Sequence, residues 1–135
     1  MTNAEEIRQR EAIMLEVHGW YAHCVPSGDK TTPTGFNYHT HGFEKSYGHK
    51  DIQIVLPINP KVAHELIIAI LSKIKSGVRF EVDIEYTGIM KNDYKVRFIA
   101  AKEYSRDVLR LLIPDKDGEF KGMYAKQFKG LDKPK

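Results

Sequence analysis

The segment 59–77 constrains the fold more than any other part of the sequence. Asn59 and Pro60 supply an N-cap residue and a proline at the first helical position, and Gly77 supplies a stop signal. Between them, apolar residues recur at the spacing of a helix with one buried face; they are Ala63, Leu66, Ile67, Ile70, Leu71 and Ile74. A helix with one apolar face must pack against another element. We therefore predict a main core helix over about residues 60–76, covering one face of a sheet.

Segments with the composition of strands precede and follow this helix. In chain order they are 20–25, 36–41, 51–58, 78–86, 94–98 and 108–113. Residues 78–86 alternate apolar and charged side chains, so we predict that they pair with 94–98 as an antiparallel hairpin with one solvated face. Residues 101–106 are predicted to form a short helix or turn.

The order of these elements predicts an α+β fold. Asn3 is a suitable cap for an N-terminal helix that ends near Gly19. We expect a mixed or mostly antiparallel sheet of about six strands, together with the N-terminal helix and the core helix. The length of 135 residues suits one domain. We place that domain at residues 1–124, followed by a flexible, Lys-rich C-terminal tail at 125–135.

Charge and hydropathy restrict the partners and the location of the protein. The formal net charge is +3, and five lysines after Glu119 account for the excess. The body of the domain is near neutral, which disfavours a nucleic-acid partner. No apolar run approaches the length that spans a bilayer, and the acidic N-terminus lacks the apolar stretch of a signal peptide. We therefore expect a cytoplasmic protein without a membrane partner.

Three of the six histidines lie within eleven residues of one another. On an extended segment His39 and His41 face the same side, because strand side chains alternate. His49 follows a short turn bounded by Gly42 and Gly48, and it can fold back toward them. Three converging neutral imidazoles would bind zinc, iron or copper. In the alternative interpretation, His39 and His41 are hydrogen-bonded residues at the sheet end, and His49 bonds the backbone at a strand entrance.

The sequence contains a single cysteine, so neither an intrachain disulfide nor a Cys-based zinc site can form. A lone cysteine is usually a small buried apolar residue, and a nucleophile served by a nearby histidine is the alternative. Aromatic residues gather in the N-terminal third, where they either belong to the core or line an apolar pocket with histidines as its polar groups. The candidate pocket residues are His39, His41, His49, Tyr38 and Cys24.

Three motifs between Val17 and Phe120 resemble, in the same order, a bacterial family of domains of unknown function. They are His18-Gly19-Trp20, then Thr40-His41-Gly42-Phe43 with Gly48-His49-x-Asp51, and finally an apolar strand followed by Pro114-Asp115-x-Asp117-Gly118-x-Phe120. The resemblance implies a single domain and no established activity. The family pattern has tyrosine at position 39 and a variable apolar residue at position 41. A His-x-His metal site would therefore belong to this branch of the family.

Two functions fit these observations. The first is a non-catalytic binding or interaction module with a pocket lined by histidine and aromatic side chains, acting on a small polar ligand or as a homodimer. The alternative is an enzyme that uses a divalent transition metal such as zinc, held by His39, His41 and His49, on a small polar substrate. We favour the first, because the sequence contains no complete catalytic constellation.

Overall fold

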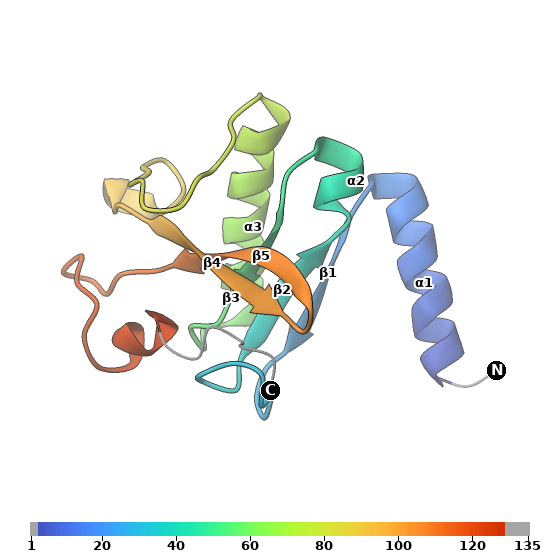
Figure 1. The fold of residues 1–135 in the computed structure, drawn as a ribbon, viewed down its shortest axis with the longest axis horizontal. Helices are drawn as coiled ribbons and strands as arrows, with labels where there is room; N and C mark the ends of the chain where they lie inside the picture. The colour runs from blue at the N-terminus through green and yellow to red at the C-terminus, as the bar shows by residue number, and fades with distance from the viewer. Residues whose placement is uncertain (1–2, 129–135) are drawn as a thin grey trace.

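The computed structural model of the chain describes residues 3–128 (Figure 1). The helices are α1 (Asn3–His18), α2 (Phe43–Tyr47) and α3 (Pro60–Lys75), and the 3₁₀ helices are η1 (Lys91–Asp93) and η2 (Gly122–Phe128). The strands are β1 (Tyr21–Val25), β2 (Asn37–His41), β3 (Asp51–Ile54), β4 (Arg97–Glu103) and β5 (Arg106–Leu112). Of the predicted tail, residues 129–135 lie outside the described residues.

The five strands form one mixed sheet in the order β1-β2-β3-β5-β4. All neighbouring strands are antiparallel except the central pair, β3 and β5, which run parallel. The predicted α+β class is therefore confirmed, with an N-terminal helix, a core helix and a five-stranded mixed sheet. None of the helices within residues 3–128 is long and apolar enough to cross a membrane.

The core helix α3 begins and ends as its sequence predicts. The side-chain oxygen of Asn59 accepts a hydrogen bond from the Lys61 N–H at 2.8 Å, and Pro60 opens the helix. All six residues of the predicted apolar face are buried. They pack against the side chains that point toward α3 from the sheet, which are Tyr38, Ile52, Ile54, Phe98, Leu109 and Leu111.

The opposite face of the sheet also has a buried centre, and there it carries polar side chains. His39 pairs with Gln53 across β2 and β3, and Gln53 pairs with Arg110 across β3 and β5. Paired residues share a face of a sheet, so these three side chains lie together on the side away from α3. Each of the three is at most 3% exposed. Buried polar groups require hydrogen-bond partners, and this face therefore carries a connected polar network.

The hairpin of β4 and β5 curls over this polar face. Neighbouring strands lie about 4.8 Å apart, so β2 and β4, three spacings apart, would be separated by about 14 Å in a flat sheet. Yet Glu103 at the end of β4 comes within 3.7 Å of His39 on β2. Figure 1 shows the end of the hairpin crossing in front of β2 and β3. The coiling of the sheet therefore brings its two outer parts together.

Two local predictions are wrong. Residues 78–86 form no strand, and only an isolated bridge joins Tyr86 to Val96. Asp83 has a φ of 62°, which breaks the extended backbone, and Val82 and Ile84 are more than 40% exposed. Of residues 101–106, predicted as a helix or turn, only 104–105 form a turn, whereas 101–103 complete β4 and Arg106 begins β5. That turn begins with Tyr104 at a φ of 57°, in the left-handed region that tight hairpins require.

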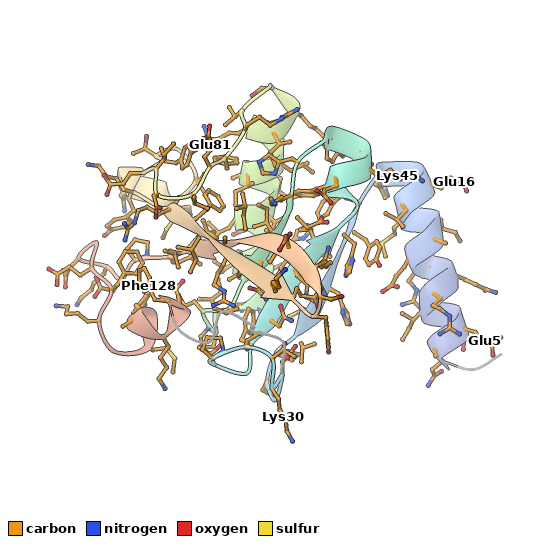
Figure 2. All side chains as sticks on the ribbon, viewed as in Figure 1. Glu5, Glu16, Lys30, Lys45, Glu81 and Phe128 are labelled. Carbon is orange, nitrogen blue, oxygen red and sulfur yellow. The ribbon has the colours of Figure 1, made fainter. Side chains whose placement is uncertain are left out.

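The N-terminal helix α1 stands beside the edge strand β1 (Figure 1). It has no fully buried residue, and the side chain of Glu16 points away from the rest of the chain (Figure 2). Ile13 and Val17 are 61% and 67% exposed. The helix is present as predicted, but it contributes little to the core.

The difference between the two faces of α3 can be measured with two isoleucines on the same helix. Ile70 is fully buried and Ile68 is 44% exposed. We expect Ile70→Ala to lower the free energy of unfolding by about 2–5 kcal/mol, because it leaves a cavity in the core. The matched change Ile68→Ala should cost less than about 1 kcal/mol. Urea denaturation of both variants tests this, and equal losses would contradict the packing of α3.

Candidate metal centre

His39, His41 and Glu103 form a compact group on the polar face of the sheet. Each offers one ligand atom, and these atoms all lie within 4.8 Å of one another. His39 and Glu103 are 3% and 4% exposed, whereas His41 is half-buried. The two histidines project from β2 at i and i+2, and Glu103 comes from the end of β4. The group is thus assembled from one strand and the hairpin that curls over it.

Aromatic contacts orient the two imidazoles. The rings of His39 and His41 meet edge to face, with centroids 5.0 Å apart. Tyr21 on β1 stacks on His41 with its centroid at 4.8 Å, and His23 approaches His39 edge-on at 5.3 Å. His23 is exposed, so the protein surface lies next to the group on the side of β1.

Arg106 holds Glu103 in place. Its Nε donates to Glu103 Oε1 at 2.7 Å, its Nη1 to Asp51 Oδ2 at 2.9 Å, and its Nη2 to the Thr40 carbonyl at 2.7 Å. The other oxygen of Asp51 accepts from the Thr40 hydroxyl at 2.7 Å and from the Phe43 N–H at 3.1 Å. The Arg106 guanidinium therefore ties the hairpin tip to the end of β2 and the start of β3. It leaves Glu103 Oε2 directed at His39.

A chain of buried amides fixes the His39 ring. Gln53 Oε1 accepts from Arg110 Nε at 2.9 Å, so its Nε2 is free to donate to Asn37 Oδ1 at 3.3 Å. Asn37 Nδ2 donates to Asp29 Oδ2 at 2.9 Å, which turns Asn37 Oδ1 toward His39. His39 Nδ1 lies 3.1 Å from that oxygen. Because Oδ1 can only accept, Nδ1 carries the proton and Nε2 presents its lone pair to Glu103.

Both imidazoles are held neutral. Burial, followed by the neighbouring His41 and Arg106, lowers the pKa of His39 to about 3. Burial, followed by Arg106, lowers the pKa of His41 to about 4, although Glu103 acts in the opposite direction. A neutral imidazole is the form that binds a metal ion. At pH 7 the group therefore has two imidazole ligands ready for a cation.

His49 lies outside this group. Its Nδ1–H donates to the Lys50 carbonyl at 2.8 Å, and its Nε2 accepts from the Phe80 N–H at 3.1 Å. Burial lowers the pKa of His49, which favours this neutral form. Both ring nitrogens thus bond the backbone, and His49 joins the start of β3 to residue 80. This is the backbone role given above as the alternative for His49.

Tyr38 and Cys24 lie on the face of the sheet opposite His39. They pair with each other across β1 and β2. The Tyr38 hydroxyl is 2.8 Å from Nδ1 of His64 on α3. Burial raises the pKa of Tyr38 to about 12. Burial also raises the pKa of the Cys24 thiol. The five candidate residues therefore occupy three places: His39 and His41 together, Tyr38 and Cys24 together, and His49 by itself.

Sequence reasoning missed Glu103, Arg106 and Asn37. The sequence contains one signal for the first two, because a carboxylate and a guanidinium stand at Glu103 and Arg106, three residues apart. On the two sides of a tight hairpin turn such residues form a pair. Residues 101–106 were predicted as a helix or turn, so this signal could not be used. Asn37 precedes His39 by two residues and shares its face, but nothing in its sequence context points to the imidazole.

Comparison with known protein families identifies the class of domain. Residues 14–122 match the family described as Domain of unknown function (DUF4262), so the chain belongs to that family. The resemblance seen in the sequence is thereby confirmed. Comparisons with curated proteins and with solved structures give no match. Most of α1 precedes the matched region, whereas His39, His41, Glu103 and Arg106 all lie inside it.

The role of Arg106 predicts a large loss of stability on its replacement. Arg106→Gln should lower the free energy of unfolding by about 2–4 kcal/mol, because two carboxylates then lose their charged partner. Arg106→Lys should recover only part of the loss, since an ammonium cannot reach all three acceptors. Lys102→Gln is the control on the same hairpin; its pair with Asp107 is exposed, and its removal should leave stability almost unchanged. We call the three contacts of Arg106 with Glu103, Asp51 and Thr40 the Arg106 clamp. Equal losses of unfolding free energy in the Arg106 and Lys102 variants, measured by chemical denaturation, would contradict its role.

The lowered pKa of His39 predicts how stability changes with pH. The unfolded chain binds a proton at His39 below about pH 6.5, whereas the folded chain does so only near pH 3. Stability should therefore fall as the pH decreases through this window. The share of His39 is about 2 kcal/mol between pH 7 and pH 5. Urea denaturation in chelator-treated buffer should show this share as the difference in pH dependence between the wild type and His39→Gln; identical profiles would exclude a buried neutral His39.

Proposed function

We propose that this domain binds one divalent transition-metal ion through His39, His41 and Glu103. The observation that carries the proposal is the pair of atoms between β2 and the hairpin. His39 Nε2 and Glu103 Oε2 are 3.7 Å apart, and both are acceptors once Asn37 holds the proton on Nδ1. Two lone pairs facing each other in a buried site are unfavourable, and a cation between them removes the conflict.

The charge balance around the group supports the same proposal. Within the Arg106 clamp, the one guanidinium contacts two carboxylates, those of Glu103 and Asp51. This arrangement leaves one net negative charge beside two neutral imidazoles. A divalent ion reverses that sign at the place where the ligand atoms converge. A monovalent organic cation would not fit among atoms so close together.

The ligand set favours a borderline transition metal. Two imidazoles and one carboxylate suit zinc, iron, copper or manganese, and no thiolate takes part because Cys24 lies on the other face. Ligand atoms around a tetrahedral zinc ion lie about 3.3 Å apart, given bonds of about 2.0–2.1 Å. The atoms here lie within 4.8 Å of one another, so a contraction of at most about 1.5 Å between any two of them suffices. Three protein ligands leave at least one position for water or a small polar ligand.

The contacts outside the ligands match those of functional metal sites. The imidazole of a metal-binding histidine usually donates its other N–H to a carbonyl or carboxylate, which fixes the ring. Asn37 takes this role for His39, and Arg106 takes the corresponding role for Glu103. This arrangement unites the two functions considered from the sequence: a binding module whose site contains a metal, with Glu103 in place of His49 as the third ligand.

Titration calorimetry with Zn²⁺ on metal-free protein tests the proposal. We expect one equivalent to bind, and inductively coupled plasma mass spectrometry to find one metal per chain. His39→Ala and Glu103→Gln should each weaken binding by at least about tenfold, and Asn37→Leu by about 10–100-fold through loss of ring orientation. Binding should persist down to about pH 5, because the lowered pKa values keep both imidazoles neutral there.

Two histidine variants outside the group serve as controls. His23→Ala removes an exposed neighbour of His39, and His49→Ala removes the backbone bonds at the start of β3. Both should bind zinc with unchanged stoichiometry, although His49→Ala should be less stable. Circular dichroism establishes that each variant is folded. Zinc binding that survives in a folded His39→Ala/Glu103→Gln double variant would refute the proposed site.

A further inference from the structure

A groove of about 690 Å³ opens on the side of the sheet away from the metal centre, between α1, β1 and α3. This size lies within the range of small-molecule sites, which is about 300–1,000 Å³. Trp20, Ala22 and Cys24 line it from the β1 segment, and Ile68 and Leu71 line it from α3. The lining is thus mainly apolar, and α1 adds Met14 and His18 to it.

Among the described residues that line the groove, Lys75 is the one charged side chain. His18 from α1, and His64 and Lys75 from α3, line it, and none of the described lining residues is acidic. Lys75 Nζ lies 5.9 Å from the centre of the Tyr47 ring, and the Tyr47 hydroxyl donates to the His18 carbonyl at 3.4 Å. Tyr47 therefore places Lys75 and His18 at the same end of the groove. That end is basic, and the floor leading away from it is apolar.

We propose that this groove binds a long-chain monocarboxylate, with its carboxylate at Lys75 and its apolar tail along Ala22 and Cys24. The ammonium group of Lys75 beside an apolar floor, with no acidic side chain among the described lining residues, fits an anionic amphipath and disfavours cationic or strongly polar ligands. Lys75 and His64 are eleven residues apart on α3, which corresponds to about 16 Å at 1.5 Å per residue. An extended dodecanoate chain has a comparable length, and it would bury its methylene groups against Ile68 and Leu71.

The groove contains two reporters of its own. Trp20 is the single tryptophan of the chain and Cys24 the single cysteine, and both line the groove. A ligand on this floor must change the emission of Trp20 and shield the thiol of Cys24. Sodium dodecanoate, added to the full chain below its critical micelle concentration, is the probe. We expect a saturable change in fluorescence, and a rate of Cys24 modification by Ellman's reagent that falls in proportion to occupancy.

Two lysines in the last turn of α3 give a matched test of the basic end. Lys75 lines the groove and Lys73 does not. Lys75→Gln should weaken dodecanoate binding about two- to fivefold, the effect of one exposed ion pair, and Lys73→Gln should leave it unchanged. Dodecanol should bind more weakly than dodecanoate to the wild type by a similar factor. Ser72→Phe, which fills the groove from α3, should abolish the response of both reporters in a folded protein.

The outcomes separate this proposal from the metal site and from other occupants. The His39→Ala/Glu103→Gln variant should bind dodecanoate like the wild type, because its changes lie on the other face. Cys24 could instead be shielded without dodecanoate, to a degree that rises with protein concentration. Together with a doubled mass in light scattering, that result would overturn the proposal and identify a second copy of the chain as the occupant of the groove. No saturation, or equal effects of the two lysine variants, would overturn it as well.

Discussion

The guanidinium of Arg106 is the interaction on which the polar half of the structure depends. It contacts groups from three elements at once: Glu103 on its own hairpin, the Thr40 carbonyl at the end of β2, and Asp51 at the start of β3. A sheet coils because its strands twist, but twist alone does not determine where the end of a hairpin comes to lie. A planar group with several fixed donors can determine it, because each acceptor restricts a different direction. The hairpin therefore crosses the sheet at one defined position.

The two faces of the sheet differ in chemistry because they are closed in different ways. The face under α3 is filled by apolar side chains, which pack without directional demands. The other face is closed by a hairpin that brings polar groups with it, so each buried donor and acceptor needs a partner. The amide chain from Arg110 through Gln53 and Asn37 to His39 meets that need. As a result, the orientation of one imidazole depends on residues from three strands and a loop.

Local signals were sufficient for some of these features and not for others. The helix α3 could be predicted because its cap, its stop and its apolar period all lie within one segment. The common face of His39 and His41 followed from the alternation of a strand. Glu103 could not be assigned to them, because its approach depends on strand order and on sheet curvature, which no short segment encodes. The alternation at 78–86 misled the prediction, since the backbone turns at Asp83. Its amides bond partly to side chains, with Phe80 N–H donating to His49 and Glu81 N–H to the Tyr86 hydroxyl, and only scattered bonds reach Val96 and Phe98.

The parallel pairing at the centre of the sheet has a consequence for the order of folding. Gln53 on β3 and its partner Arg110 on β5 are 57 residues apart in the chain, whereas β4–β5 closes a two-residue turn and β1–β2 a connection of eleven residues. Bringing distant segments together costs more chain entropy before any contact compensates for it, so the hairpins can form early and the β3–β5 pair must follow. His39 and Glu103 stand on opposite sides of that late junction. A chain arrested before the junction forms would contain every residue of the proposed metal site without bringing them together, so metal binding at that site would report that the β3–β5 junction has formed.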